Sequence, residues 1–427
     1  MKSSRQKNRR LAFFAAAAAA AVLTLGTSGC GSSGSAKSST VTGGGGGGNG
    51  GGGGGAAVAN TQTITVNTGP AASPPTNEPF VNGAFTSVKV CAPGTSTCQT
   101  VSGILVDTGS AGLRILSSAL TVQLPQQTNS AGNPIVECLQ FLDSITWGPV
   151  EMADVTLAGE VAKSLPVQVI GTAQFPNIPM ACSSSGPPKE DLAGLGANGL
   201  LGVGNFAQDC GTACTVTGPA NPGLYYACPA SGCAVTEESV ANQVKNPVAL
   251  FETDNNGVVI QLPAVTGAEA SVSGTMTFGI GTQSDNALGS ATVFTIDPNT
   301  GDFTTTFKNT TVDKAFLDTG SNGIFFLTSS VTGLPECTDM PFFYCPTMTQ
   351  SLSAVTKGSN GATMTVNFTV ANADSLTANV NNAALQGLAG PISGLFDWGL
   401  PFFYGRTVFV AIEGKSTPGG TGPFWAF

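Results

Sequence analysis

Residues 103–116 read GILVDTGSAGLRIL, and residues 314–327 read KAFLDTGSNGIFFL. In both stretches an apolar run typical of a buried strand ends in Asp-Thr-Gly-Ser, and a Gly and a second apolar run follow. Glycine lets the backbone turn where a side chain would obstruct it. One copy of these ordinary turn residues would be weak evidence. Two copies with matching flanks, 211 residues apart, predict a duplicated half-site.

The chemistry that this duplication predicts is that of a carboxyl pair. If the two half-sites face each other across a pseudo-two-fold axis, Asp107 and Asp318 share one proton, because two adjacent carboxylates cannot both ionise cheaply. The ionised member can then take a proton from a water molecule that attacks a peptide carbonyl, and the protonated member can donate to the carbonyl oxygen. We expect Thr108 and Thr319 to hold the two loops in register. The other expected members of the loops are Gly109, Gly320, and Ser110 and Ser321, whose hydroxyls can hydrogen-bond the outer carboxylate oxygens.

These loops resemble those of the pepsin-like aspartic peptidases, in which each of two lobes carries a hydrophobic-hydrophobic-D-T-G-S/T motif. The resemblance implies an all-β, bilobal fold with two pseudo-symmetric β lobes and a central cleft. It also implies that Asp107 and Asp318 are the catalytic pair, with no metal and no cofactor.

Two further stretches match the family in order and spacing. Pepsin-like lobes place a hydrophobic-hydrophobic-Gly strand under each active-site loop, and residues 199–202 (GLLG) fit this pattern, with Gly202 located 95 residues after Asp107. Residues 395–409 (LFDWGLPFFYGRTVF) resemble the terminal motif of the family, with Gly399 located 81 residues after Asp318 as the counterpart of Gly202. The resemblance therefore extends over roughly residues 80–415.

The hairpin flap that covers the cleft in pepsin-like enzymes normally carries a Tyr-Gly pair. In this sequence Trp147-Gly148 is the candidate for that position, followed by Pro149, which fits poorly in a hairpin arm. A core or surface position for Trp147 is the alternative.

Composition narrows the chemistry further. The chain has no histidine, which excludes Ser-His-Asp and Cys-His catalysis and histidine-ligated zinc. Only 10% of the residues are charged, and Gly is abundant, as in secreted β-rich proteins. Without the five basic residues of the first ten positions, 11 basic residues face 25 acidic ones, a net charge of −14. This balance argues against nucleic acid as a partner.

Residues 1–30 are typical of an export signal, with a basic start, an Ala-rich apolar run and small residues before Cys30. Residues 26–30 (GTSGC) resemble a bacterial lipobox, which implies that Cys30 is lipidated and that a lipid is the only membrane anchor. An ordinary secretory signal is the alternative. Gly31 and Ser32 directly follow Cys30, where an Asp would favour retention in the inner membrane, so we expect the outer membrane, at its periplasmic face or at the cell surface.

The remaining domain boundaries follow from composition. Residues 31–78 are rich in Gly and Ser and include two runs of six glycines, so we expect a flexible tether. Residues 79–285 are expected to form the N-terminal lobe with the first D-T-G-S, and residues 286–427 the C-terminal lobe with the second.

Ten cysteines remain after Cys30, and an even number in an exported chain favours five disulfides. Cys91 with Cys98, and Cys337 with Cys345, are predicted to close local loops. The pairing of the middle six stays open. A zinc site is the alternative for the last four of them, although their spacings differ from the usual C-x2-C. The middle six are Cys138, Cys182, Cys210, Cys214, Cys228 and Cys233.

The sequence as a whole favours an aspartic endopeptidase at the bacterial envelope that acts as a monomer on peptides or unfolded proteins. The first alternative is a pepsin-like lipoprotein without useful turnover, which binds peptides or has a structural role in the envelope. The second alternative, an adhesin or envelope β-sandwich, leaves the paired motif unexplained.

Overall fold

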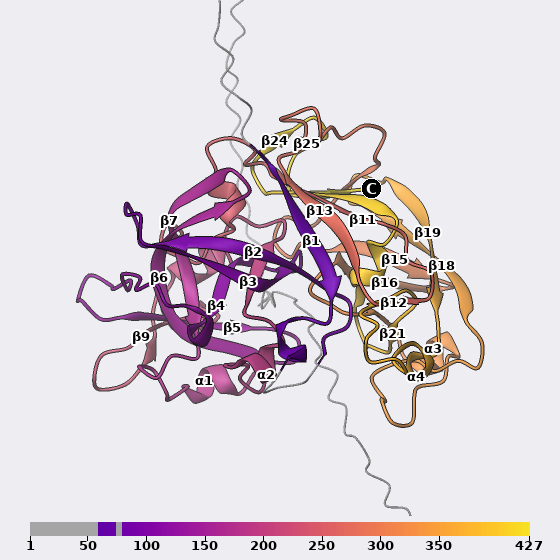
Figure 1. Ribbon diagram of the computed structural model, residues 1–427, viewed down its shortest axis with the longest axis horizontal. Helices are drawn as coiled ribbons and strands as arrows, with labels where there is room; N and C mark the ends of the chain where they lie inside the picture. The colour runs from indigo at the N-terminus through magenta and orange to yellow at the C-terminus, as the bar shows by residue number, and fades with distance from the viewer. Residues whose placement is uncertain (1–58, 74–78) are drawn as a thin grey trace, which may run out of the picture.

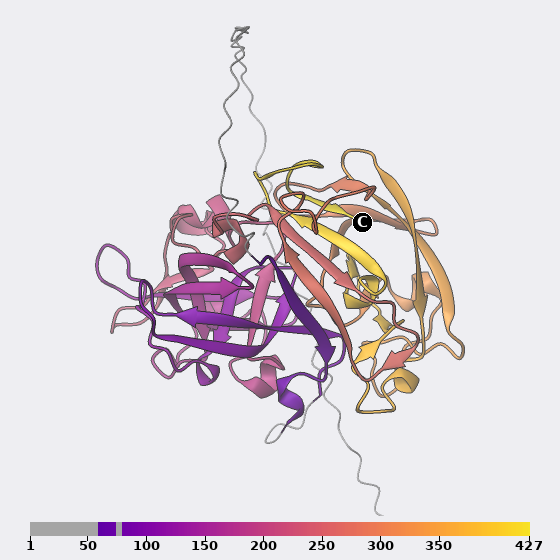
Figure 2. The ribbon, with the colours of Figure 1, turned by 45° about the horizontal axis from the view of Figure 1, so that its top comes forward.

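The computed structural model describes residues 59–73 and 79–427, and these residues form two β-rich lobes side by side (Figure 1). The first half of the chain builds one lobe, and most of the second half builds the other (Figure 2). The all-β, bilobal architecture predicted from the sequence is confirmed. The predicted signal peptide, Cys30 and most of the predicted tether lie outside the described residues.

Strands dominate both halves of the chain, and helices are short. Up to residue 278 the strands are β1 (Thr61–Asn67), β2 (Gly83–Cys91), β3 (Cys98–Asp107), β4 (Ala111–Leu116), β5 (Ile135–Gln140), β6 (Ile145–Leu157), β7 (Glu160–Ile170), β8 (Gly199–Val203), β9 (Tyr225–Ala227), β10 (Ala234–Val235), β11 (Gly257–Leu262), β12 (Ala268–Glu269) and β13 (Val272–Phe278). After residue 278 they are β14 (Val293–Thr295), β15 (Phe303–Phe307), β16 (Thr310–Leu317), β17 (Ile324–Phe326), β18 (Gln350–Lys357), β19 (Thr363–Val370), β20 (Ala384–Leu385), β21 (Ala389–Gly390), β22 (Phe396–Trp398), β23 (Arg406–Ala411), β24 (Ser416–Thr417), β25 (Gly420–Thr421) and β26 (Phe424–Ala426). The α-helices are α1 (Met180–Ser183), α2 (Leu192–Leu195), α3 (Ser329–Thr332) and α4 (Ala373–Leu376), and the 3-10 turns include η5 (Pro247–Leu250) and η6 (Leu400–Phe402).

The two lobes share a sheet. Within the described residues, the larger sheet runs in the order β10-β9-β5-β6-β7-β4-β8-β3-β2-β1-β13-β11-β23-β26-β14. Strands β23 and β26 follow the second D-T-G-S loop in the chain, whereas β11, with which β23 pairs, precedes it. The C-terminal lobe has its own sheet, in the order β19-β18-β15-β16-β22-β17-β21. The shared strands therefore connect the two lobes.

The predicted boundary between tether and lobe is wrong at its C-terminal side. Residues 61–67 (TQTITVN) form β1, which pairs with β13 and β2 inside the shared sheet. Their alternation places Ile64 and Val66 in the core, fully buried, while Thr61, Thr63 and Thr65 point to the opposite face and stay at least partly exposed. The composition of the glycine-rich segment before them obscured this period-two pattern.

The core of the C-terminal lobe is aromatic. The rings of Phe396 and Trp398 stack with centroids 4.5 Å apart, and Phe326 stacks on Phe396 at 5.2 Å. Phe368 meets Trp398 edge to face at 5.2 Å. Because side chains alternate along a strand, Phe396 and Trp398 point to one face of β22, and the residue between them, Asp397, points to the other.

The five predicted disulfides are present. Cys91–Cys98 and Cys337–Cys345 close local loops as predicted. The middle six cysteines pair as Cys138–Cys182, Cys210–Cys214 and Cys228–Cys233, so the zinc interpretation of the last four is wrong. Cys138–Cys182 closes the longest loop, with a sequence separation of 44 residues, and joins β5 to α1.

The different loop lengths predict different contributions to stability. Replacing Cys138 and Cys182 together with Ala should lower the free energy of unfolding by about 4 kcal/mol, because the open form gains the entropy of a long loop. The same double replacement at Cys228 and Cys233, which are five residues apart, should cost about 2 kcal/mol. Urea unfolding of the two variants without reductant measures the difference, and equal losses would contradict the loop-length argument.

Candidate active site

Each D-T-G-S loop lies where a buried strand ends against a second strand that passes beneath it. In the N-terminal lobe, Asp107 is the last residue of β3, and β8 runs parallel to β3 with Gly202 opposite Asp107. In the C-terminal lobe, β22 runs parallel to β16, with Trp398 opposite Leu317, the residue before Asp318. The strand after each loop, β4 or β17, pairs antiparallel with the same passing strand. Each aspartate is therefore fixed between two strands and a turn.

The passing strands approach the loops so closely that they require glycine. A Cβ atom on Gly202 would lie 2.7–2.8 Å from the backbone of Ala111, and one on Gly399 would lie 2.1 Å from the carbonyl oxygen of Gly323. Real Cβ atoms do not make such contacts, so these positions admit no side chain unless the backbone moves. The structure thus brings Gly202 and Gly399 to equivalent places beside the two loops.

The two loops are joined by reciprocal threonine hydrogen bonds. The hydroxyl of Thr108 donates to the carbonyl oxygen of Leu317 at 3.0 Å and accepts from the backbone N–H of Thr319 at 3.0 Å. In return, the hydroxyl of Thr319 donates to the carbonyl oxygen of Val106 at 2.7 Å and accepts from the backbone N–H of Thr108 at 3.0 Å. Each threonine therefore satisfies buried backbone groups of the opposite lobe.

The two carboxyls meet above this junction. Asp107 and Asp318 are 1% and 0% exposed, and their carboxyl groups lie side by side, close enough for each to shift the pKa of the other. A Cβ atom on Gly320 would lie 2.8 Å from Oδ1 of Asp107 and 3.0 Å from Oδ1 of Asp318. Both carboxyl oxygens therefore lie against the backbone of this turn, at a place where only glycine leaves them room. The pair described by these contacts is called the dyad below.

The same donors hold each carboxyl of the dyad. Oδ1 of Asp107 accepts from the N–H of Gly109 at 2.8 Å, and Oδ1 of Asp318 accepts from the N–H of Gly320 at 2.7 Å. The second oxygen of each accepts from a serine hydroxyl, Ser110 for Asp107 and Ser321 for Asp318. All eight residues of the two motifs are thus brought together with near two-fold symmetry.

The electrostatic surroundings of the two carboxyls are not symmetric. Burial raises the pKa of Asp107, but the Ser110 hydroxyl, Asp318, the Gly109 N–H and the charge of Arg114 all favour its ionised form. Burial raises the pKa of Asp318 well above its usual range, and negative charge on Asp107 and Asp397 raises it further. Asp107 is therefore the member of the dyad that gives up its proton first.

Arg114 belongs to a buried polar cluster behind the first loop. Its Nη2 atom lies 2.6 Å from Oε1 of Glu137 and 3.0 Å from Oδ2 of Asp209, and the side chains are almost fully buried. The hydroxyl of Tyr225 donates to Asp209 at 2.7 Å and accepts from the N–H of Val244 at 2.8 Å. This cluster connects β4 and β5 to residues 209–233, the insert that carries the Cys210–Cys214 and Cys228–Cys233 disulfides. It also brings a cation near Asp107.

Asn82 forms a second junction between the lobes. Its side-chain amide donates to the carbonyl oxygens of Asn322 and Leu385 at 2.8 and 2.9 Å, and its Oδ1 accepts from the N–H of Leu385 and the hydroxyl of Tyr404, both at 2.7 Å. The sequence analysis did not single out Asn82, because an isolated Asn is an ordinary loop residue.

Trp147 and Gly148 lie inside β6, more than eight residues before the turn that joins β6 to β7. Trp147 is 1% exposed, its indole N–H donates to the carbonyl oxygen of Phe175 at 2.9 Å, and its ring meets Tyr226 edge to face at 5.2 Å. A Cβ atom on Gly148 would lie 1.9 Å from the carbonyl oxygen of Val169. This pair packs in the core of the lobe, which is the alternative that the sequence left open, and it does not form a hairpin tip.

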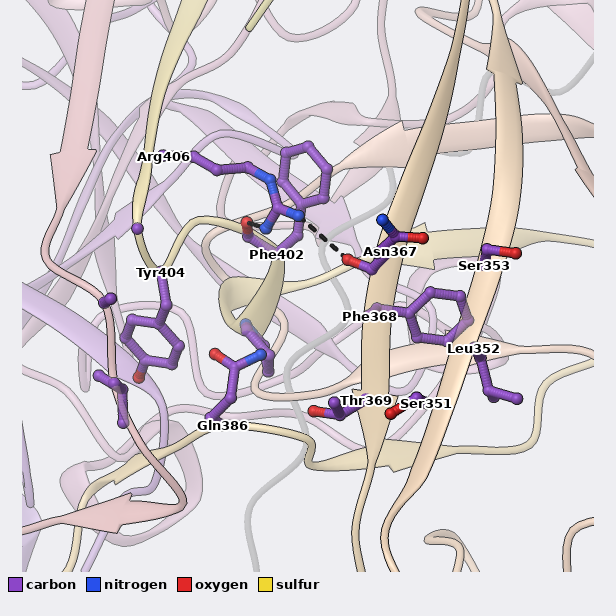
Figure 3. A pocket seen from close by; sticks show the side chains of 14 residues that line it. Ser351, Leu352, Ser353, Asn367, Phe368, Thr369, Gln386, Phe402, Tyr404 and Arg406 are labelled. Carbon is purple, nitrogen blue, oxygen red and sulfur yellow. Dashed lines mark hydrogen bonds between the residues drawn. The ribbon is translucent and has the colours of Figure 1, made fainter.

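Two features away from the dyad have the form of a ligand site. A groove of about 630 Å³ lies between β18–β19 and the η6–β23 segment (Figure 3), and neither aspartate of the dyad lines it. Its Arg406 donates to the carbonyl oxygens of Phe402 and Asn367, and its guanidinium lies 4.6 Å from the centre of the Phe402 ring, so backbone and ring already engage this cation.

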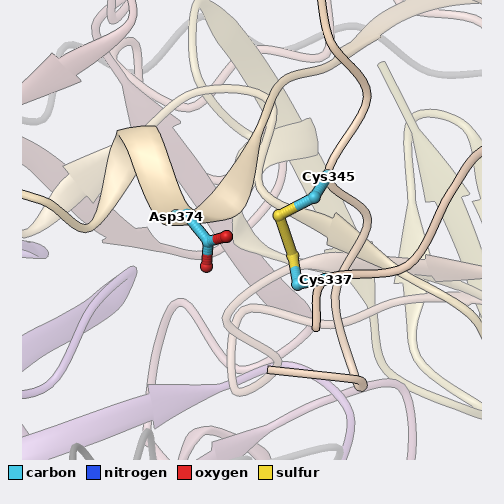
Figure 4. A group of neighbouring side chains, drawn as sticks. All are labelled: Cys337, Cys345 and Asp374. Atoms are coloured by element: carbon cyan, nitrogen blue, oxygen red, sulfur yellow. A yellow bond between two sulfur atoms is a disulfide. The ribbon is translucent and has the colours of Figure 1, made fainter. Parts of the chain in front are cut away.

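The second feature is a cluster of Cys337, Cys345 and Asp374, whose possible ligand atoms lie within 4.8 Å of one another (Figure 4). The two sulfurs are bonded to each other in a disulfide, so neither is available as the thiolate that binds a metal ion. Within the described residues, no helix has the length and apolar character needed to span a membrane.

Two β lobes joined by a shared sheet, with a paired D-T-G-S junction between them, define the bilobal fold of the pepsin-like aspartic proteinases. The chain belongs to the family described as "Protein of unknown function (DUF3443)", whose model matches residues 56–427. Among solved structures, it is similar to the aspartic proteinase from Irpex lacteus, with a TM-score of 0.50 and 16% sequence identity, over 86% of this chain and 97% of that one. No curated protein matches the sequence. At this identity the similarity shows the fold alone.

The threonine junction generates a prediction about stability. Replacing Thr108 with Val keeps its shape but leaves the N–H of Thr319 and the carbonyl of Leu317 unpaired and buried, so the free energy of unfolding should fall by about 2–4 kcal/mol. Replacing Thr319 with Val should cost about as much, because its contacts mirror those of Thr108.

Thr108→Ser serves as the matched control, since it keeps the hydroxyl and removes only a methyl group. Chemical denaturation compares the three variants with the parent protein. Equal destabilisation by Val and Ser at position 108 would show that packing, rather than the reciprocal hydrogen bonds, holds the junction.

Proposed function

We propose that this protein is an aspartic endopeptidase in which Asp107 and Asp318 together activate one water molecule. The observation that supports this proposal most directly is the dyad itself. Two buried carboxyls lie side by side, and each is fixed by a backbone N–H and a serine hydroxyl at the junction of two lobes. Two carboxyls placed so close together share one proton over a wide pH range, which supplies a general base and a general acid at one place.

The proposed reaction uses one ionised and one protonated carboxyl. The ionised carboxyl takes a proton from water as the water oxygen bonds to the peptide carbonyl carbon, and the protonated carboxyl donates its proton to the carbonyl oxygen. When this tetrahedral diol collapses, the C–N bond breaks and the nitrogen takes the proton that came from water. One diol hydroxyl returns a proton to the second carboxyl, so the dyad ends with one proton again. Because the pair titrates as a unit, activity should be greatest in acid.

The setting of the proposed activity rests on the sequence. An export signal followed by a lipobox-like stretch supports a protein anchored through a lipid on Cys30 to the bacterial outer membrane, with peptides or unfolded proteins as substrates. Five disulfides are compatible with an exported protein. We propose that the protein acts as a monomer without nucleic-acid partners, since both half-sites of the dyad lie in one chain.

A second function is favoured by one observation. Trp147 and Gly148 pack inside the N-terminal lobe, so the predicted flap pair does not clamp a peptide in the cleft. A pepsin-like lipoprotein that binds peptides or supports the envelope, without useful turnover, would not require that clamp.

Cleavage of an unfolded protein substrate by the full-length protein, measured from pH 3 to pH 7, tests the proposal. Acid-favoured cleavage should fall by about 10²–10⁴-fold in Asp107→Asn and in Asp318→Asn, because each change removes one partner in proton transfer. It should also be blocked by a statine-type peptide. Asp313→Asn, an exposed position on β16 just before the second loop, is the matched control and should cleave normally.

The other outcomes separate the two functions. A folded protein that never cleaves, yet is stabilised against heat by the statine-type peptide, would replace the enzyme proposal with the peptide-binding one. If neither cleavage nor stabilisation occurs, both functions fail. A truncation that starts at residue 80 is unsuitable for this test, because it removes β1 from the shared sheet.

A further inference from the structure

A third buried aspartate lies beside the dyad. Asp397 is the middle residue of β22 and is 0% exposed. It sits opposite Phe316 of β16 and Phe325 of β17, so its neighbours across the sheet are apolar. The aromatic residues on either side of it along β22 point to the opposite face, into the core of the lobe.

Its polar surroundings consist of the second motif loop. The hydroxyl of Ser321, which donates to Oδ2 of Asp318 at 2.7 Å, also lies against the carboxyl of Asp397. Neither oxygen of Asp397 has a hydrogen-bond partner of normal geometry. A buried carboxyl with so few donors is costly to ionise, and it shares its nearest donor with Asp318.

The other half of the chain shows what this position holds without the acid. Asp397 lies two residues before Gly399, and the residue two before Gly202 is Leu200, which pairs with Leu105 as Asp397 pairs with Phe316. Leu200 is 1% exposed in an apolar cluster of the N-terminal lobe. The strand that passes beneath a motif loop therefore folds with leucine at this place, and packing alone does not require the aspartate.

The two half-sites also differ in the residue that pairs with this position on the strand after each motif loop. Leu200 faces Arg114 on β4, whereas Asp397 faces Phe325 on β17. The N-terminal half-site thus has a buried cation, and the C-terminal half-site has a buried acid. Asp107 is influenced by the charge of Arg114, and Asp318 by the charges of Asp107 and Asp397. Asp397 is in turn influenced by the charge of Asp107.

We propose that Asp397 is a positioning residue of the dyad, which disfavours negative charge on Asp318 and so assigns the carboxylic acid to Asp318 and the carboxylate to Asp107. In the reaction, Asp107 is then the base that takes the proton from water, and Asp318 is the acid that protonates the carbonyl oxygen. Arg114 acts in the same direction from the other lobe, by favouring the ionised form of Asp107. The assigned roles of base and acid rest on the proposed function. The effect of Asp397 on the protonation of Asp318 does not.

The three carboxyls do not form a compact cation site. Asp107, Asp318 and Asp397 are not among the described groups whose ligand oxygens all lie within 4.8 Å of one another.

The sign of the effect follows from the repulsion between like charges. Burial raises the pKa of Asp397 well above its usual range, and negative charge on Asp397 raises the pKa of Asp318. Without Asp397, Asp318 should lose its proton at lower pH. Activity falls on the alkaline side of the pH profile when Asp318 becomes ionised. This fall should then occur at lower pH.

The test compares Asp397→Asn and Asp397→Leu with the full-length parent protein. In both variants kcat/KM on the alkaline side of the profile should fall roughly threefold to tenfold relative to the acid plateau, the scale of one nearby charge. Asn keeps the shape of the side chain, and Leu is the residue found at the equivalent place in the other lobe. Phe396→Leu, which removes packing on the opposite face of β22, should leave the profile in place.

A second readout does not need activity. Titration of protein labelled with 13C at the aspartate carboxyls, followed by NMR, should show the Asp318 signal changing at lower pH in both Asp397 variants than in the parent. An unchanged midpoint, or a shift toward alkaline pH, would overturn the inference. If the parent neither cleaves nor binds a statine-type peptide, the proposed function fails, while this titration still decides the role of Asp397.

Discussion

The reciprocal hydrogen bonds between Thr108 and Thr319 are the contacts on which the arrangement of this protein depends. The two motif loops are turns, and their backbone groups are buried where water cannot satisfy them. Each loop obtains its missing partners from the threonine of the opposite lobe. Neither half-site is therefore complete by itself. The two loops have to lie together to satisfy their buried backbone groups, and this brings the two carboxyls that they carry together.

Much of this arrangement could be predicted from the sequence, because the decisive signal is local and appears twice. The D-T-G-S copies with their apolar flanks predicted the bilobal fold and the carboxyl pair, and short cysteine spacings predicted two of the five disulfides. Spacing from each Asp also led to Gly202 and Gly399, because a passing strand without side chains leaves a recognisable glycine. Such features depend on residues that lie close together along the chain.

What escaped prediction depends on distant pairings. Strand β1 was hidden by the composition of the segment before it, and only its pairing with β13, over 200 residues later, shows its place in the sheet. Trp147 next to a Gly has the composition of a flap, but its burial against Tyr226 depends on an insert far along the chain. Asp397 lay inside a recognised motif. Nothing local sets it apart, because its difference from Leu200 involves a strand of the other half-site.

The pseudo-symmetry of the two half-sites is strict in the backbone and is broken in the buried charges. Hydrogen bonds, registers and glycines repeat from one lobe to the other, whereas Arg114 and Asp397 each occur in one lobe only. The geometry thus makes the two carboxyls equivalent in position, and the surrounding charges make them different in proton affinity.

That combination depends on the two halves being encoded as separate stretches of one gene. In a dimer of identical chains every substitution occurs twice, so an acid beneath one loop would be matched by an acid beneath the other, and two further carboxyls would surround the pair. Covalent linkage of the halves lets leucine remain at position 200 while aspartate occupies position 397. Covalent linkage therefore does more here than ensure that two lobes meet, because it allows the two sides of one site to carry different residues.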